Sequence, residues 1–185
     1  MPHIDQPQRL NLTTTSLQNV IISNATDVIY YEVVTPKWEP SVTRVSKMDP
    51  KTQELEIIAE MQNIVLDKAT KKIASPATVR LRGQQFRPTG DFWLKDGVAG
   101  TDSRGARFRG KDGKYYQWRE RKRKLELIRT DDPEPKPVAI YHRHRRYFPV
   151  LPMLRQPYLE VQPSVMETLD SLIVSFLLME QTKRS

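Results

Sequence analysis

Apolar and polar residues alternate along most of this chain, in short runs that are separated by proline, aspartate, asparagine or glycine. Alternation of this kind, rich in β-branched and aromatic residues, is typical of strands with one buried face. Residues 55–73 leave two alternatives open, because helix propensity over 54–66 competes with the strand pattern. The runs that predict strands are 28–35, 41–46, 55–61, 78–82, 91–94, 106–109, 115–119, 124–128, 138–141 and 157–161.

The clearest local signal is the pair Asp112-Gly113 between two such runs. Asp-Gly is typical of a two-residue hairpin turn, because both turn positions need a positive φ. On the return strand, Tyr116 and Trp118 share one face. We expect these two aromatic residues, with Phe108 and Trp93, to lie in the core.

The C-terminal segment has a different pattern. Ser164 and Glu167 have the spacing of a capping box and predict a helix start. The helix is expected over about 164–182, and residues 172–179 are apolar on nearly every face. A helix of this kind must be enclosed by protein or by lipid.

Burial inside the protein is the favoured alternative for this helix. A membrane span needs about 20 predominantly apolar residues, and the apolar stretch here is shorter and contains Asp170 and Ser171. Tail anchoring in a membrane is the competing hypothesis.

Many short strands followed by one apolar helix predict a mainly β (α+β) fold. We expect a closed antiparallel β-barrel filled by the C-terminal helix. Residues 1–8 are expected to form a flexible arm, and residues 9–185 a single domain, since 185 residues suffice for one sizeable core.

The order of these segments resembles an uncharacterised fungal domain family with a tubby-like β-barrel, related in fold to phospholipid scramblases. The resemblance covers about residues 10–183 and is carried mainly by the hairpin. The matching residues of the family's motif, a phenylalanine followed by Asp-Gly-x-x-Tyr-x-Trp, are Phe108, Asp112, Gly113, Tyr116 and Trp118.

The resemblance implies the barrel fold and a buried C-terminal helix rather than an activity. Tubby domains bind phosphoinositides through a lysine and arginine pair that has no residue-by-residue counterpart here. Scramblases carry cysteine-rich and calcium-binding segments, whereas this chain has no cysteine. Scramblase activity is therefore not expected.

Charge adds a further feature. The chain has a formal net charge of +8, and residues 79–146 hold 19 Lys and Arg against 9 Asp and Glu. A basic block attracts phosphate, on nucleic acid or on a membrane surface. The excess of basic residues can also serve solubility alone.

Two basic clusters stand out within this block, at 119–124 and 143–146. The first is also typical of a solvated hairpin end whose charges block edge pairing, or of a nuclear import signal. The second can equally be a solvated loop. The candidate anion-binding residues are Arg119, Arg121, Lys122, Arg123, Lys124, Arg143, Arg145 and Arg146.

Metal, cofactor and catalytic chemistry are not expected. His142 and His144 share one side of a strand, but two imidazoles are too few for a zinc site, and the neighbouring arginines repel a cation. The glycine loops and nucleophile motifs of common enzyme classes are absent from the sequence. The N-terminus lacks a secretory pattern, so a cytoplasmic protein is expected, with the nucleus or the membrane surface as alternatives.

The sequence therefore predicts a non-catalytic binding domain. We expect its basic face to recruit it to anionic, phosphoinositide-like lipid headgroups or to another polyanion. A protein-interaction or structural module without an anion ligand is the alternative, and nucleic-acid binding is third.

Overall fold

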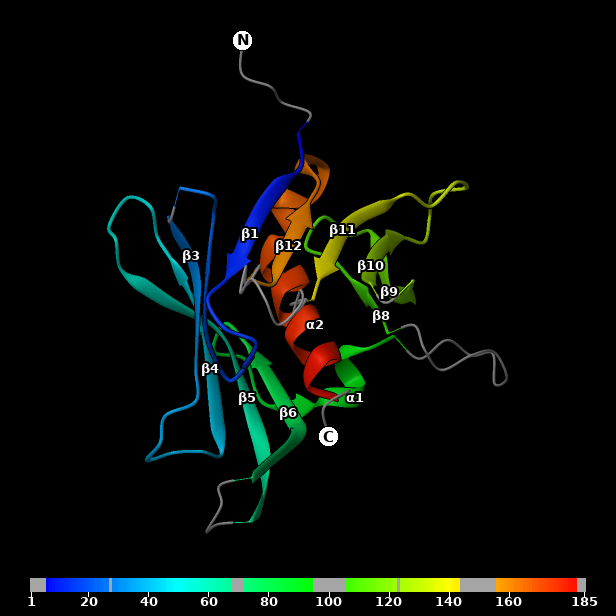
Figure 1. The fold of residues 1–185 in the computed structure, drawn as a ribbon. Coiled ribbons are helices and arrows are strands. Elements are labelled where there is room, and N and C mark those ends of the chain that lie inside the picture. The colour runs from blue at the N-terminus through cyan, green and yellow to red at the C-terminus, as the bar shows by residue number, and fades with distance from the viewer. Residues whose placement is uncertain are drawn as a thin grey trace, which may run out of the picture.

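The computed structural model describes residues 6–26, 28–67, 72–94, 106–122, 124–143 and 156–182. In these residues twelve strands form one antiparallel sheet, accompanied by a short helix and a C-terminal helix (Figure 1). The strands are β1 (Gln8–Leu12), β2 (Asn19–Ser23), β3 (Ile29–Val34), β4 (Val42–Met48), β5 (Leu55–Asp67), β6 (Lys72–Leu81), β7 (Arg87–Pro88), β8 (Arg107–Arg109), β9 (Tyr115–Arg121), β10 (Lys124–Arg129), β11 (Pro137–His142) and β12 (Tyr158–Val161). The helices are α1 (Thr89–Phe92), the 3₁₀ helix η1 (Pro163–Thr168) and α2 (Leu169–Thr182).

The sheet consists of two meanders that are joined at one pair of strands. The strand order is β7-β6-β5-β4-β3-β2-β1-β12-β11-β10-β9-β8. The first strand, β1, pairs with the last, β12, so that Leu10 lies opposite Leu159. The sheet curls around α2, with β3–β6 on one side of the helix and β8–β11 on the other (Figure 1).

The expectation of a closed barrel is wrong, because β7 and β8 are the two ends of the sheet and do not pair. β7 has two residues, and its Pro88 has no backbone N–H to donate. The segment expected as a strand at 91–94 instead contains the end of α1. Leu94 bridges the gap with a backbone hydrogen bond from its N–H to the Arg107 carbonyl at 2.8 Å.

Aromatic side chains cover this gap. Phe92 stacks on Phe108 with ring centroids 6.0 Å apart, and Trp93 lies edge-on to Phe92 at 4.9 Å. Phe108 is fully buried, whereas Phe92 and Trp93 are partly buried against the core. Packing of rings, rather than continuous strand pairing, therefore holds the two ends of the sheet together.

The ambiguous segment 55–73 belongs to strands in its described part. β5 runs from Leu55 to Asp67 and pairs with both β4 and β6. β4 supplies partners for Leu55–Gln62 and β6 for Ala59–Asp67, so the whole strand is paired on at least one side, which outweighs the local helix propensity. The chain also forms β1 and β2, which the sequence pattern did not reveal, and β1 begins at Gln8, inside the expected arm.

Burial of the C-terminal helix inside the protein is confirmed. Its central apolar side chains are at most 1% exposed. They pack against inward-facing residues of both meanders, for example Tyr141 against Phe176 at a centroid distance of 4.6 Å. The described part of the chain contains no helix that is long and apolar enough to cross a membrane. These central side chains are Leu172, Ile173, Val174, Phe176, Leu177 and Leu178.

The start of this helix differs from the predicted capping box. Residues Pro163–Thr168 form a 3₁₀ helix whose N-cap is Gln162, and no side chain caps it. Pro163 occupies the first turn, where its missing N–H leaves no donor unpaired. The α-helix proper begins at Leu169.

Polar contacts at three points along α2 fix it within the sheet. Near its start, Asp170 accepts hydrogen bonds from the Tyr31 hydroxyl at 2.6 Å, from Lys47 at 2.8 Å and from Arg82 at 2.6 Å. In its middle, the Trp118 indole N–H donates to the Ser175 hydroxyl at 2.9 Å. Near its end, Glu180 accepts from Arg143 at 2.8 Å. Since these partners come from both meanders, the contacts set both the position and the rotation of the helix.

Candidate anion-binding surface

The first basic cluster forms the tip of the β9–β10 hairpin. Tyr116 and Trp118 point into the core, so Arg119 and Arg121 lie on the outer face of β9. Arg121 lies opposite Lys124, and Lys122 occupies the turn between them with φ 49°. Arg121 and Lys122 are exposed, and Lys124 is partly exposed.

Two of the candidate cations are held by carboxylates. Arg119 lies opposite Glu126 on β10 and pairs with it at 3.2 Å. Arg143 pairs with Glu120 at 3.2 Å and with the buried Glu180 of α2 at 2.8 Å. The hydrogen bond to Glu180 raises the pKa of Arg143. Because Glu180 belongs to α2, this ion pair links the helix to the end of β11.

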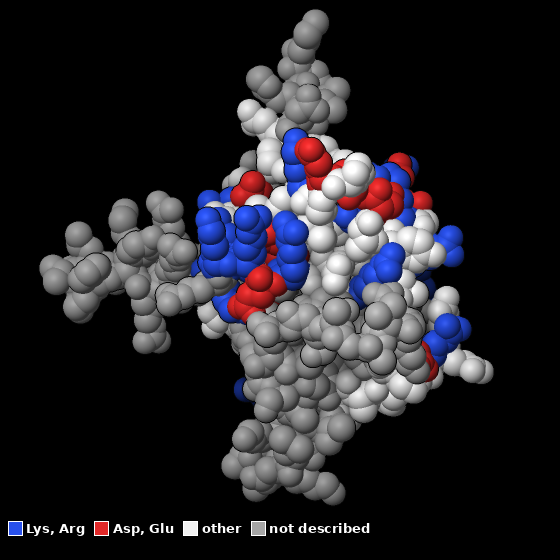
Figure 2. Space-filling model, turned by 90° about the vertical axis from the view of Figure 1, so that its right-hand side faces the viewer, with Lys and Arg blue, Asp and Glu red and all other residues white. Residues whose placement is uncertain are grey.

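The remaining candidates differ from these two. Among the described residues, Arg121, Lys122 and Lys124 form no ion pair, whereas Arg123, Arg145 and Arg146 lie outside the described residues. Figure 2 shows basic side chains gathered on the side of the molecule where β8–β11 lie, with acidic side chains among them. The tip of the β9–β10 hairpin is thus the described part of the cluster whose charge is uncompensated.

His142 lies next to this tip and does not add to its charge. Its ring stacks on Tyr158 with centroids 4.3 Å apart, and Nε2 lies 3.3 Å from a Glu160 carboxylate oxygen. Burial lowers the pKa of His142, and the charge of Lys124 lowers it further. His144 is outside the described residues, and the described part of the chain has no cluster of three acidic or histidine side chains suited to a metal.

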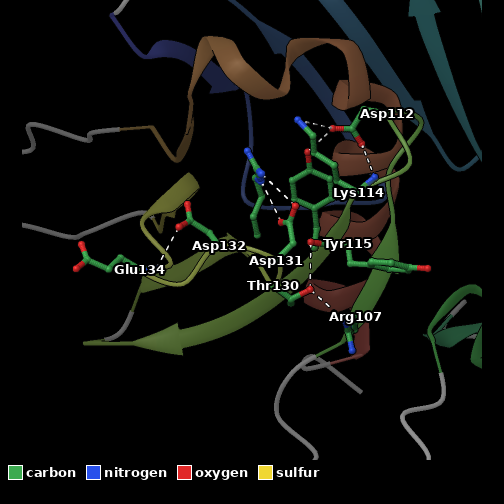
Figure 3. Close-up of polar contacts among 10 residues, drawn as sticks. Arg107, Asp112, Lys114, Tyr115, Thr130, Asp131, Asp132 and Glu134 are labelled. Carbon is green, nitrogen blue, oxygen red and sulfur yellow. Dashed lines mark hydrogen bonds and ion pairs between the residues drawn. The ribbon is translucent and has the colours of Figure 1, made fainter.

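At the opposite end of these strands, charged side chains form hydrogen bonds and ion pairs within the turns (Figure 3). Asp112 accepts hydrogen bonds from the Tyr116 hydroxyl at 2.6 Å and from the Lys114 N–H at 3.2 Å. Arg129 pairs with Asp131, and its hydrogen bond lowers the pKa of that carboxyl. The end of the hairpins at Asp112 is therefore nearly balanced in charge, in contrast to the tip at Lys122.

The hairpin motif that carries the family resemblance is structural. Phe108, Tyr116 and Trp118 are buried as expected. The turn, however, is longer than the two-residue type, since the Gly110 N–H bonds the Lys114 carbonyl at 2.8 Å and only Gly113, at φ 81°, has a positive φ within it. The three-residue loop 111–113 between Gly110 and Lys114 lets Asp112 fold back onto the Tyr116 hydroxyl.

This turn also contacts the C-terminal helices. The Lys111 N–H donates to the Thr168 hydroxyl at 2.9 Å, at the end of η1. A Cβ atom on Gly110 would lie 2.5 Å from the same hydroxyl oxygen, so the turn and η1 are in direct contact there. Together with the bond from Trp118 to Ser175, these contacts make the motif the docking site for η1 and α2.

The model of DUF6593, a family of unknown function, matches residues 14–185. The chain belongs to this family. The expected membership of an uncharacterised family is thus confirmed, and the DUF6593 match includes the whole hairpin motif and the C-terminal helix. No curated protein and no solved structure matches the chain.

Proposed function

We propose that this chain is a non-catalytic binding domain that is recruited to anionic lipid headgroups, phosphoinositide-like in charge, through the tip of its β9–β10 hairpin. The observation that carries the proposal is the contrast within one basic cluster. Arg119 and Arg143 are neutralised by glutamates, whereas Arg121, Lys122 and Lys124 are at least partly exposed and form no ion pair among the described residues.

The charges at the tip are suited to a surface rather than to a deep pocket. They stand on a tight turn whose flanking strands are anchored by the buried Trp118 and Leu125. Each lysine or arginine near an anionic membrane contributes about 1 kcal/mol, and the attraction falls off within a Debye length of about 10 Å. Binding through this tip therefore depends on several residues together and weakens as salt rises.

Liposome co-sedimentation tests the proposal. The double variant Arg121→Glu/Lys122→Glu is compared with Lys51→Glu/Lys136→Glu, which changes the net charge equally at two exposed lysines away from the tip. Vesicles of neutral lipid are compared with vesicles that contain phosphoinositide, at low and at high salt. We expect salt-sensitive binding to the anionic vesicles, at least about tenfold weaker for the tip variant and nearly unchanged for the control variant.

Other outcomes would redirect the proposal. Equal losses in both variants would mean that net charge, not the tip, attracts the lipid, and no binding at low salt would exclude lipid recruitment. Competition by duplex DNA would favour a nucleic-acid ligand. A protein-interaction module is the second candidate, favoured by Leu55 and Ile57, each 45% exposed at the start of β5.

A further inference from the structure

A pocket of about 210 Å³ lies at the seam where the sheet fails to close. On one side is the edge of β6, which β7 covers only at Thr78 and Val79. On the other side is β8, and α1 with Leu94 spans the gap between them.

The inner wall of the pocket is apolar. Val79 and Phe108 are buried, and the Phe92 ring stacks on Phe108 at 6.0 Å. Leu94 contributes an apolar side chain that is 40% exposed. Leu81 completes this wall.

The rim of the pocket is polar and mainly basic. Among the described lining residues, Arg80, Arg87 and Arg109 are basic and Asp91 is acidic. Gln84 and Gln85 also line it. The described lining residues are therefore mainly basic beside an apolar wall.

Arg87 is the cation at the rim that is available to a ligand. Arg80 is engaged by Glu60 and lies over the Phe86 ring, and Arg109 donates from Nε to the Gly113 carbonyl at 3.2 Å. By contrast, Arg87 is exposed, and its side chain forms no hydrogen bond or ion pair within the described residues. The side chains of Gln84 and Gln85 likewise form no hydrogen bond with described residues.

We propose that this seam pocket binds a small amphipathic anion, a phosphate or carboxylate group attached to a ring or a short apolar chain. The charged group is held by Arg87 and by the amides of Gln84 and Gln85, and the apolar part rests on Phe92 and Phe108. The volume of about 210 Å³ is below the roughly 300 Å³ at which sites for drug-sized ligands begin, which suits a smaller ligand. The site shares no residue with the β9–β10 tip, so this proposal does not depend on lipid recruitment.

The test uses phenyl phosphate as the probe, added to the full ¹⁵N-labelled chain and followed by amide chemical shifts. Inorganic phosphate supplies the charge without the ring, and phenol supplies the ring without the charge. We expect phenyl phosphate to bind more tightly than either and to shift the amides of Gln84, Gln85 and Arg87. The variant Arg87→Gln should raise the Kd about tenfold, because it removes a charge-assisted hydrogen bond.

The control variant is Lys136→Gln, which makes the same charge change at an exposed lysine outside the pocket. It should leave the Kd unchanged, and both variants should keep the dispersed spectrum of the folded chain. Three results would overturn the proposal. These are no shifts up to about 10 mM phenyl phosphate, where even a millimolar ligand saturates, equal affinity for inorganic phosphate, or an Arg87→Gln variant that binds as the parent does.

Discussion

At the scale of single residues, one glycine decides how closely the hairpin motif approaches the C-terminal helices. A Cβ on Gly110 would lie 2.5 Å from the Thr168 hydroxyl oxygen, 2.6 Å from Asp112 Oδ1 and 2.7 Å from Tyr116 Cε2. Its φ is not in the positive range, so the requirement for glycine here is one of space. Two of these neighbours belong to the motif itself and the third belongs to η1.

Gly110→Ala should therefore destabilise the fold by about 2 kcal/mol, the cost of inserting a methyl group into a packed contact. Gly90→Ala is the matched control, because a Cβ there would meet nothing within 4 Å. It should be neutral or slightly stabilising, since Gly90 lies in α1. Urea denaturation measures both free energies of unfolding, and equal values for the two variants would contradict the spatial argument.

The ion pairs of single residues also decide which cations are available to a ligand. The pairing of Arg119 with Glu126 follows from the hairpin register, so the sequence could have indicated it once the turn at Lys122 was known. The pairing of Arg143 with Glu180 joins residues 37 positions apart, one just after β11 and the other on α2, and no local sequence pattern indicates it. The residues of the seam pocket were missed for the same reason.

At the scale of elements, α2 is the core around which the sheet curls. Its apolar residues face strands of both meanders, and Ser175 is fully buried with its hydroxyl bonded to both Trp118 and the Leu172 carbonyl. A helix that is apolar on nearly all sides and enclosed by strands cannot be removed without exposing the inner face of the sheet.

Truncation after Gln162 should therefore leave a chain without a stable fold, whereas truncation after Thr182 keeps α2 and should leave the fold intact. Circular dichroism and amide chemical-shift dispersion of the two chains distinguish the outcomes. A well-dispersed spectrum from the shorter chain would contradict the role of α2 as core and favour the tail-anchor hypothesis.

At the scale of the whole molecule, Asp170 connects three elements of the first meander to the start of α2. Burial by itself would raise the pKa of Asp170, but the hydrogen bonds from Lys47 and Tyr31, with the charge of Lys47, outweigh it and hold the pKa below its ordinary value. A carboxyl whose pKa is lower in the folded state stabilises that state above the pKa of the unfolded chain, about 3.9. This stability is lost as the pH falls through the folded pKa.

Asp170→Asn should lower the free energy of unfolding by about 2 kcal/mol at neutral pH, the range of hydrogen bonds to charged groups. The difference from the parent chain should shrink as the pH falls below about 4, where the parent loses the same contribution. Urea denaturation across this pH range measures both, with Glu54→Gln as a control at an exposed carboxylate. Parallel pH profiles for the parent and Asp170→Asn would show that Asp170 is not the group responsible.

The openness of the sheet is also a property of the whole molecule. Closure would need β7 and β8 to pair, yet these are the shortest strands and Pro88 lacks a donor. The aromatic contact between Phe92 and Phe108 replaces strand pairing at this point, and the seam pocket is the space that it leaves.

The sequence by itself determined the β-rich class, most of the strands, the buried aromatic face of β9 and the apolar C-terminal helix. These features depend on period, composition and length, which are local properties of a chain. Only the tertiary structure decided that the sheet stays open, that Arg119 and Arg143 are neutralised, and that a pocket lies beside Arg87. These depend on which residues meet across long sequence separations, and a short pattern carries no information about such contacts.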